Sequence, residues 1–341
     1  MHQVVVSEVS PLKAFVKPSP PLQIGEGDIL VHICKFVLTS NTITYALVGR
    51  SVLNTFVHYP TGDSNFASSP AWGIGVVVAS RAGHIKVGTR IRGYFPMRCY
   101  CVLKPSKVTR NIFEDVAEHR SKTINAYRSY TIQDSFSASQ ADKEDLAVAG
   151  GSLYSTGFSA SMQGEMKGAT SVVYTSASSR TALAGAFAAK FNNLSFKRIG
   201  VTSQRNLEFV KSTNYYNEVV TYDMVRTLRV LPNDKVAIYD MAGNIECNAE
   251  LRKHFNKHII DFSGVGKTHV SLDGPQAFGG GNKDLVAKYG GAKEESFLIF
   301  VALAKAQKRY GKKKINKMLI ESQNAYIEVE LKKFKAKRVY G

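Results

Sequence analysis

The sequence predicts an α/β protein in which a β-rich, barrel-like domain precedes a doubly wound parallel sheet. Up to about residue 140, short apolar segments are separated by Gly and Pro clusters, as at 17–22 and 24–28, a spacing typical of a partly open barrel. From about residue 141, apolar strands alternate with helical segments, which indicates a parallel sheet covered on both faces. We therefore expect a β-rich domain at 1–140, a sheet domain at 141–290, and a basic helix and strand at 291–341 that return to the first domain.

The expected strands of the first domain are short and rich in β-branched residues, with turn residues between them. They lie at 4–6, 28–34, 74–79, 89–94 and 100–103. Since each is short and is bounded by turn signals, the domain is expected to be β-rich.

The second domain is expected to begin with a helix over 144–166, followed by alternating strands and helices. The strands are expected at 171–175, 198–202, 218–222, 235–240 and 258–262, with helices at 182–191, after Ser203, and after 244 to about 254. Ser203 is expected to cap its helix, because serine oxygens accept hydrogen bonds from free amides there. The remaining segments are expected to form a Gly-rich loop at 264–291, one or two helices at 294–323 and a final strand at 326–332.

Composition excludes several protein classes. With 44% hydrophobic and 21% charged residues the chain is globular. No apolar run reaches 18 residues, so no membrane span is expected, and the N-terminus has neither a signal-peptide core nor a transit helix. The four cysteines lack metal or disulfide spacing, which favours a reducing compartment. An intracellular protein of the mitochondrial matrix or the cytoplasm is therefore expected.

The formal net charge of +18 is unusual for a soluble metabolic enzyme. Residues 302–341 contain twelve Lys and Arg against three Glu, so half of the excess lies in the last 40 residues. The two clusters are Lys305, Lys308, Arg309, Lys312, Lys313, Lys314 and Lys317, and then Lys332, Lys333, Lys335, Lys337 and Arg338. Such runs can bind phosphate backbones or acidic protein surfaces by releasing counterions. The alternative is a solvated helix face with a charged tail.

The stretch at 171–190 reads as a buried strand, a tight turn of small hydroxyl residues and an Ala-rich helix, which is the layout of a nucleotide-phosphate cradle. Amides at the start of such a helix point at a pyrophosphate, and small side chains let the ligand approach them. The glycines usual at this turn are replaced by serine and alanine. The candidate phosphate-binding residues are Ser176, Ala177, Ser178, Ser179, Arg180 and Thr181. The alternative is a strand–helix turn that binds nothing.

The end of the second strand indicates which dinucleotide would bind. NAD-preferring folds have an acid there for the ribose hydroxyls, and this sequence has none. Ser203 and Arg205 could hold a 2′-phosphate instead, which favours NADP(H). The remaining candidate cofactor-binding residues are Thr202, Tyr222, Asp240, Met241 and Ala242, at the ends of the strands.

The order of the two domains resembles the medium-chain dehydrogenase/reductase superfamily, in its quinone-oxidoreductase branch. Within it the chain resembles a little-characterised, zinc-less family of unknown function. The matching segments are 38–47, 70–75, 93–97, 176–182, 200–203, 240–244 and 265–269, spread over most of the chain. The resemblance implies a GroES-like barrel followed by a Rossmann-type sheet.

The resemblance also implies candidate catalytic residues. Zinc enzymes of the superfamily use a Gly-His-Glu segment, and the corresponding 71–75 has no ligand, so no metal is expected. Asn41 and Tyr45 match the residues that line the nicotinamide pocket of zinc-less relatives, and Tyr94 and Met97 would face the same cleft. Tyr45 is the candidate proton donor, and an ordinary barrel aromatic is the alternative.

Two departures from the family leave two functions open. The aromatic segment that relatives carry after a Gly-Pro is replaced here, because 274–278 is followed by the Gly-rich 279–283, and the C-terminal region is strongly basic. The first hypothesis is an NADP(H)-dependent reductase of a carbonyl, quinone or activated alkene, with an unknown small-molecule substrate and a homodimer as the expected assembly. The second is a non-catalytic subunit of a large mitochondrial or ribosomal assembly that binds RNA or protein through its basic surface.

Overall fold

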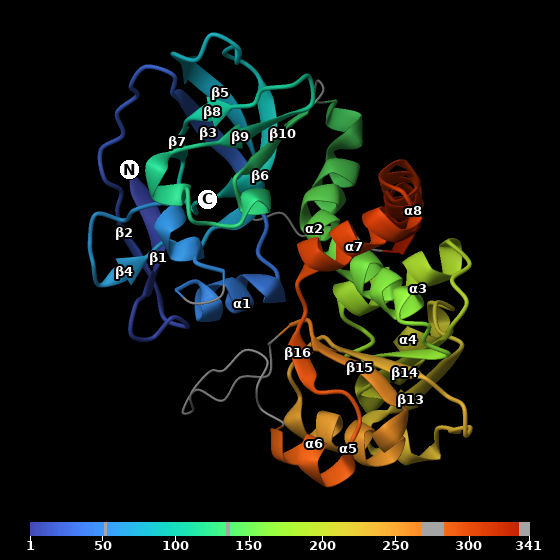
Figure 1. The fold of residues 1–341 in the computed structure, drawn as a ribbon. Coiled ribbons are helices and arrows are strands. Elements are labelled where there is room, and N and C mark those ends of the chain that lie inside the picture. Colours follow the sequence, from blue (N-terminus) through green and yellow to red (C-terminus); the bar gives the residue numbers. More distant parts are fainter. Residues whose placement is uncertain (51–52, 134–136, 267–282, 334–341) are drawn as a thin grey trace. The chain divides into compact units, whose positions relative to one another are not determined.

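The computed structural model describes residues 1–341 except 51–52, 134–136, 267–282 and 334–341. The chain divides into two compact units, Met1–Ala149 and Gly150–Gly341 (Figure 1). Helix α2 (Ala141–Met166) contains the point of division. Each unit is described by itself.

The first unit is built on antiparallel sheets, as the sequence predicts. The larger, barrel-like sheet has the order β7-β3-β5-β6-β10-β9-β8, and the smaller has the order β2-β1-β4. The strands are β1 (His2–Ser7), β2 (Ala14–Pro18), β3 (Ile29–Phe36), β4 (Phe66–Ala67), β5 (Ala71–Ser80), β6 (Arg90–Phe95), β7 (Tyr100–Leu103), β8 (Pro105–Ser106), β9 (Ile112–Asp115) and β10 (Ser129–Gln133). Alternate residues of β3, among them Ile29, Val31 and Ile33, point into its core because side chains alternate across a strand.

Helix α1 (Ser40–Val48) follows β3 and was not expected from the strand-rich pattern of this domain. Thr39 and Thr42 form a reciprocal capping box at its start, in which each side chain bonds the other residue's backbone. Short 3₁₀ helices complete the unit: η1 (Thr55–His58), η2 (Glu118–Arg120), η3 (Asn125–Tyr127) and η4 (Ala138–Gln140).

The second unit contains a six-stranded, all-parallel sheet with the order β13-β12-β11-β14-β15-β16. Its strands are β11 (Ser171–Tyr174), β12 (Lys197–Thr202), β13 (Glu218–Thr221), β14 (Val236–Asp240), β15 (Ile259–Gly264) and β16 (Glu294–Ser296). The order reverses direction at β11, and ligands of doubly wound sheets bind where the carboxyl ends of the strands meet at such a point. The predicted doubly wound α/β fold is confirmed.

The helices of the second unit pack around this sheet. They are α2, α3 (Arg180–Phe191), α4 (Leu207–Ser212), α5 (Ile245–Phe255), α6 (Lys283–Tyr289), α7 (Ile299–Tyr310) and α8 (Lys312–Lys333), with the 3₁₀ helices η5 (Gln204–Asn206), η6 (Tyr222–Thr227) and η7 (Asn256–His258).

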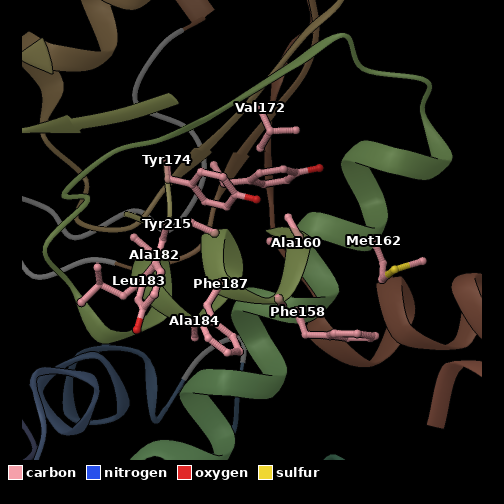
Figure 2. Packing of buried hydrophobic residues seen from close by; sticks show 14 of the residues in the cluster. Phe158, Ala160, Met162, Val172, Tyr174, Ala182, Leu183, Ala184, Phe187 and Tyr215 are labelled. Atoms are coloured by element: carbon pink, nitrogen blue, oxygen red, sulfur yellow. The ribbon is translucent and has the colours of Figure 1, made fainter. Parts of the chain in front are cut away.

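The core beneath the predicted cradle is made by α2, β11 and α3. Figure 2 shows side chains of all three elements meeting there, including Phe158, Val172, Tyr174 and Phe187. Helices α2 and α3 approach closely because Gly157 meets Gly185, and a Cβ on Gly157 would clash with the backbone of α3. This contact fixes α3 and therefore the turn that precedes it.

Three expectations for the C-terminal region are wrong. Residues 326–332 lie in α8 and form no strand, because the buried Ser322, Tyr326 and Glu330 recur every four residues and lie on one helix face. Tyr326 packs against Tyr154 and Phe187, both at a ring-centroid distance of 5.2 Å. The expected loop at 264–291 contains α6, and the segment expected to be helical at 294–323 begins with β16.

Candidate functional site

The turn between β11 and α3 is compact and has small side chains. Ser176 has a φ of 45°, a left-handed conformation that glycine usually supplies. The amide of Ala177 donates to the carbonyl of Val201 at 3.0 Å, so the turn is held against β12. Ser179 is the N-cap of α3, and its hydroxyl accepts from the amide of Ala182. The first amides of α3 have no intrahelical acceptor and carry the positive end of the helix dipole.

The serine hydroxyls of the turn contact the ends of the neighbouring strands. Ser176 Oγ lies 3.1 Å from the hydroxyl of Tyr222, which follows β13. Ser178 Oγ accepts from Asn206 Nδ2 at 3.0 Å. Burial raises the pKa of Tyr222, and its hydrogen bond with Ser176 opposes that rise, so its phenol remains a neutral donor at physiological pH. These contacts bring two predicted cofactor residues, Ser176 and Tyr222, together, and they place Ser178 beside the end of β12.

The end of β12 places Thr202, Ser203 and Arg205 beside this turn. Thr202 is fully buried, and its hydroxyl has no hydrogen-bond partner in the described part of the chain. Ser203 takes the N-cap position of η5 without making a side-chain cap, so its predicted capping role is wrong and its hydroxyl is not used there. Arg205 is exposed and makes no ion pair with any described residue. Within the described chain, the Ser203 hydroxyl caps no helix and Arg205 forms no ion pair, so both side chains could contact a ligand.

Asp240, at the end of β14, holds the turn that follows it. Its Oδ1 accepts from the hydroxyl of Thr175 at 2.7 Å and from the amides of Ala242 and Gly243, both at 3.1 Å. Its Oδ2 accepts from Asn248 Nδ2 at 2.7 Å. Asp240, Met241 and Ala242 are all buried, so the Asp240 carboxylate already has partners within the protein.

In the first unit, Asn41 and Tyr45 lie one turn apart on α1 and therefore on one helix face. The indole Nε1 of Trp72 donates a hydrogen bond to the Tyr45 hydroxyl at 3.0 Å. The side chains of Tyr127 and Asn41 form hydrogen bonds with the same hydroxyl. Burial raises the pKa of Tyr45, and these three hydrogen bonds oppose the rise. Because indole can only donate, Trp72 leaves the proton of Tyr45 available to another acceptor.

Aromatic rings surround Tyr45 and keep it in place. The Tyr45 ring lies 5.2 Å from that of Tyr94 and 5.8 Å from that of Tyr127, both edge to face. Trp72 packs on the same two rings at 5.4 and 6.1 Å. Tyr94 is fully buried and Met97 is 8% exposed, so both residues belong to the interior of this unit.

His58 is a further residue of this cluster, and the sequence reasoning missed it. Its ring is fully buried, 5.8 Å from that of Tyr94. Nδ1 lies 3.2 Å from the carbonyl of Thr55, which can only accept, so Nδ1 carries the proton. Burial and then the charge of Arg120 lower the pKa of His58 to about 3, so the ring is neutral. Its Nε2 has no partner in the described part of the chain.

The sequence reasoning also missed Trp72 and Tyr127 as partners of Tyr45. The single tryptophan of the chain was a usable signal, since it lies in the segment that replaces the zinc ligands. Tyr127 gave no local signal, because it lies 82 residues after Tyr45 and only folding brings the two together.

Neither metal ligands nor a membrane span emerge from the described residues. They contain no group of three His, Cys, Asp or Glu side chains that could hold a metal ion. His254 and His258, four residues apart, form hydrogen bonds with the carbonyls of Leu228 and Asp234. No helix in the described ranges is both long and apolar enough to cross a bilayer.

Some sequence expectations fall on residues that the structure does not describe. They are the substituted segment at 274–278, most of the Gly-rich 279–283, the residues 267–269 of the last matching segment, and the cations Lys335, Lys337 and Arg338.

Comparison with family models decides the family. The model of a family described as "Protein of unknown function (DUF2855)" matches residues 36–341. The chain belongs to the DUF2855 family. This confirms the prediction of a little-characterised family. No curated protein sequence matches this DUF2855 protein.

Solved structures share the fold of this DUF2855 protein. CurA from Vibrio vulnificus in complex with NADPH has a TM-score of 0.61 at 14% identity, over 97% of this chain and 89% of that one. Escherichia coli quinone oxidoreductase complexed with NADPH has a TM-score of 0.55 at 14% identity, over 98% of both chains. The mitochondrial 2-enoyl thioester reductase heterodimer from Candida tropicalis has a TM-score of 0.54 at 12% identity, over 99% of this chain and 91% of that one. The predicted medium-chain dehydrogenase/reductase fold is therefore confirmed.

Proposed function

We propose that this DUF2855 protein is an NADP(H)-dependent reductase of a carbonyl, quinone or activated alkene. The observation that carries the proposal is the β11–α3 turn, where small residues precede the free amides of a twelve-residue helix. Two of the similar structures, CurA and the quinone oxidoreductase, are complexes with NADPH, which supports the same cofactor here.

The β11–α3 turn fits a pyrophosphate. Ser176 adopts the left-handed backbone conformation that a glycine usually supplies at this turn. Ser176 Oγ is hydrogen-bonded to Tyr222, and Ser178 Oγ is hydrogen-bonded to Asn206. The amides of Arg180 and Thr181 would then bind phosphate oxygens, as helix N-termini do elsewhere. Arg180 adds a positive charge at the same turn.

Ser203 and Arg205 fit the 2′-phosphate that distinguishes NADP from NAD. Arg205 is an exposed cation without an acidic partner in the described chain, and Ser203 has a hydroxyl that caps nothing. A guanidinium and a hydroxyl bind a phosphate by charge-assisted hydrogen bonds. We assign Asp240 a positioning role, because its carboxylate bonds Thr175, two amides and Asn248.

Tyr45 is the proposed proton donor. The cofactor, when bound, supplies the hydride that reduces the substrate carbon. Tyr45 holds its own proton at Oη, because burial raises its pKa above the ordinary value, and gives that proton to the substrate oxygen or carbanion. The phenolate that remains accepts hydrogen bonds from Trp72, Tyr127 and Asn41, and a proton from solvent restores Tyr45. A homodimer, and the mitochondrial matrix or cytoplasm as the location, stay predictions.

A cofactor titration tests this function. NADPH is added to the purified full chain and its fluorescence is followed, in parallel with NADH. Saturable NADPH binding well below millimolar, tighter than NADH binding, is the expected result. Reduction of a quinone, an α,β-unsaturated carbonyl and a simple aldehyde is then measured by NADPH consumption.

A pair of serine variants identifies where the cofactor binds. Ser178→Leu places a bulky side chain in the turn and is expected to weaken NADPH binding by tenfold or more, on the order of 1.4 kcal/mol. Ser212→Leu adds the same side chain at an exposed position of the same unit and is the matched control. Undiminished NADPH binding by Ser178→Leu would show that the cofactor does not use this turn.

A further inference from the structure

The corner between α7 and α8 carries the densest positive charge among the described residues. Seven cations lie within thirteen residues, and every one of them is exposed: Lys305, Lys308, Arg309, Lys312, Lys313, Lys314 and Lys317. We call these seven residues the basic corner. It lies within the second unit, at the junction of the two red helices of Figure 1.

The basic corner is held on a rigid scaffold. Ala306 and Ile315 are fully buried on either side of the turn. Gln307 Nε2 donates to Asn316 Oδ1 at 2.8 Å, and the amide of Gly311 donates to the carbonyl of Gln307 at 3.0 Å. The cations are therefore displayed from ordered helices, so a ligand would not have to order the backbone first.

Acidic residues hardly compensate this charge. The single ion pair of the basic corner within the described chain joins Lys317 to Glu321 at 3.8 Å, and both side chains are largely exposed. Lys312, Lys313 and Lys314 occupy the first turn of α8, which contains no acid. Cations are unfavourable at the positive end of a helix dipole, so an anion bound there would relieve the repulsion.

The positive surface continues into a groove of about 640 Å³ at the edge of the sheet. Arg309 Nη1 donates to the carbonyl of Met166 at the end of α2, and Gly168 and Thr170, which follow, line the groove. Lys235 and Lys257 also line it, are exposed, and pair with no acid in the described chain. The one acid in the lining, Asp234, accepts from Thr170 Oγ1 and from the amide of Leu231.

This groove lies at the end of the sheet opposite to the β11–α3 turn. Its lining residues Thr170, Lys235 and His258 immediately precede β11, β14 and β15, whereas the turn follows β11. In a parallel sheet the two ends are separate surfaces. The basic corner and the groove therefore form a second surface that the proposed reductase site does not use.

We propose that the basic corner and the groove bind a nucleic acid through its phosphate backbone. No large apolar side chain between 305 and 317 is exposed, whereas membrane-bound helices insert apolar residues and the centres of protein interfaces lack charge. Exposed lysines and an arginine, of which only Lys317 pairs with an acid in the described chain, suit a regular row of phosphates, whose counterions they release. Such binding is largely independent of base sequence.

Fluorescence anisotropy of the full chain with a labelled single-stranded RNA of about 20 nucleotides tests the proposal. Duplex DNA of equal length distinguishes the form of the nucleic acid. We expect affinity to fall steeply with salt. The charge reversal K312E/K313E/K314E should weaken binding by about tenfold or more and reduce the salt slope by about two, since each lost phosphate contact on a single strand removes roughly 0.7. K235E/K257E should weaken binding to a smaller extent.

The control variant K13E/K86E/K122E has the same net charge, and its three exposed lysines lie in the first unit. It should bind RNA within about threefold of the unmodified chain at the same salt. Circular dichroism melting and NADPH binding establish that each variant is folded, and K312Q/K313Q/K314Q replaces the reversal variant if that one fails to fold. Equal losses in control and corner variants would overturn the proposal, as would binding only to anionic vesicles or to an acidic peptide.

Discussion

The two parts of the proposed reductase are built in opposite ways. The β11–α3 turn uses neighbours in sequence: a left-handed Ser176, a capping Ser179 and the amides of one helix. The surroundings of Tyr45 come from distant segments, since Trp72 and Tyr127 are 27 and 82 residues away from it. The turn is partly exposed and acts through backbone, whereas Tyr45 is 5% exposed and acts through a side chain.

This contrast separates binding from chemistry. Backbone amides and small residues offer a phosphate site that changes little with the titration of side chains. A buried phenol surrounded by rings has a shifted pKa and a fixed orientation, which suits proton transfer. Variants of the turn should therefore change cofactor affinity, and variants of the Tyr45 cluster should change turnover.

Tyr45→Phe should change activity more than any other variant, and it distinguishes proton transfer from cofactor binding. Tyr45→Phe keeps the ring but removes the proton, so we expect kcat for NADPH-dependent reduction to fall by about 100-fold or more. The NADPH Kd should stay within about twofold, which fluorescence titration measures. Tyr100→Phe, at a half-buried position of the same unit, is the control and should retain activity. Unchanged turnover in Tyr45→Phe would assign the proton to another group.

The second effect is a pH dependence of the stability that arises from His58, in the buried cluster around Tyr45. His58 has a pKa of about 3 when folded and about 6.5 when unfolded, so the unfolded chain binds the proton first. Its contribution to stability is complete above pH 6.5 and is lost as the pH falls from 6.5 toward 3, at up to about 1.4 kcal/mol per pH unit. His58→Gln should flatten this part of the curve of unfolding free energy against pH.

Denaturant unfolding at pH values between 4 and 7 measures that curve. His84→Gln, at an exposed position of the same unit, should leave the slope unchanged. If His58→Gln and the unmodified chain lose stability in parallel, His58 does not titrate as its burial implies.

The third effect concerns Arg205, which is exposed in η5 beside the β11–α3 turn. Arg205→Ala removes the charge proposed to hold the 2′-phosphate, so we expect NADPH binding to weaken by about tenfold, on the order of 1.4 kcal/mol, while NADH binding is unchanged. Arg229→Ala, another exposed arginine of the same unit, is the control. A parallel loss for both cofactors would indicate that Arg205 does not select between them.

The smallest effect refines the description of the Tyr45 cluster. Trp72→Phe removes one hydrogen bond to the Tyr45 hydroxyl and keeps most of the packing. Loss of this donor should raise the pKa of Tyr45 further and lower kcat a few-fold, about 1 kcal/mol. The alkaline limb of the pH–rate profile should then move to higher pH. A limb that moves to lower pH would contradict the assigned hydrogen bond.

Features that depend on neighbouring residues could be predicted from the amino-acid sequence. Alternating strands and helices and the small residues of the β11–α3 turn could be inferred, because periodicity and turn composition are local. The Ser179 cap was not among the predictions, and the predicted Ser203 cap is not formed. The helical spacing of Asn41 and Tyr45 is local too, yet α1 was not expected, because its surroundings are rich in strand signals.

The contacts between residues that are distant in sequence could be known only from the folded chain. Residues 326–332 alternate like a strand, yet they are helical because Tyr326 packs on Tyr154 and Phe187. The sequence indicates Asp240 as a cofactor-binding residue, and only the fold shows that its carboxylate accepts hydrogen bonds from Thr175 and Asn248. Contacts between distant segments follow from how elements pack, and spacing along the chain does not encode them. The partners of Tyr45 and the meeting of the basic corner with the groove are of this kind.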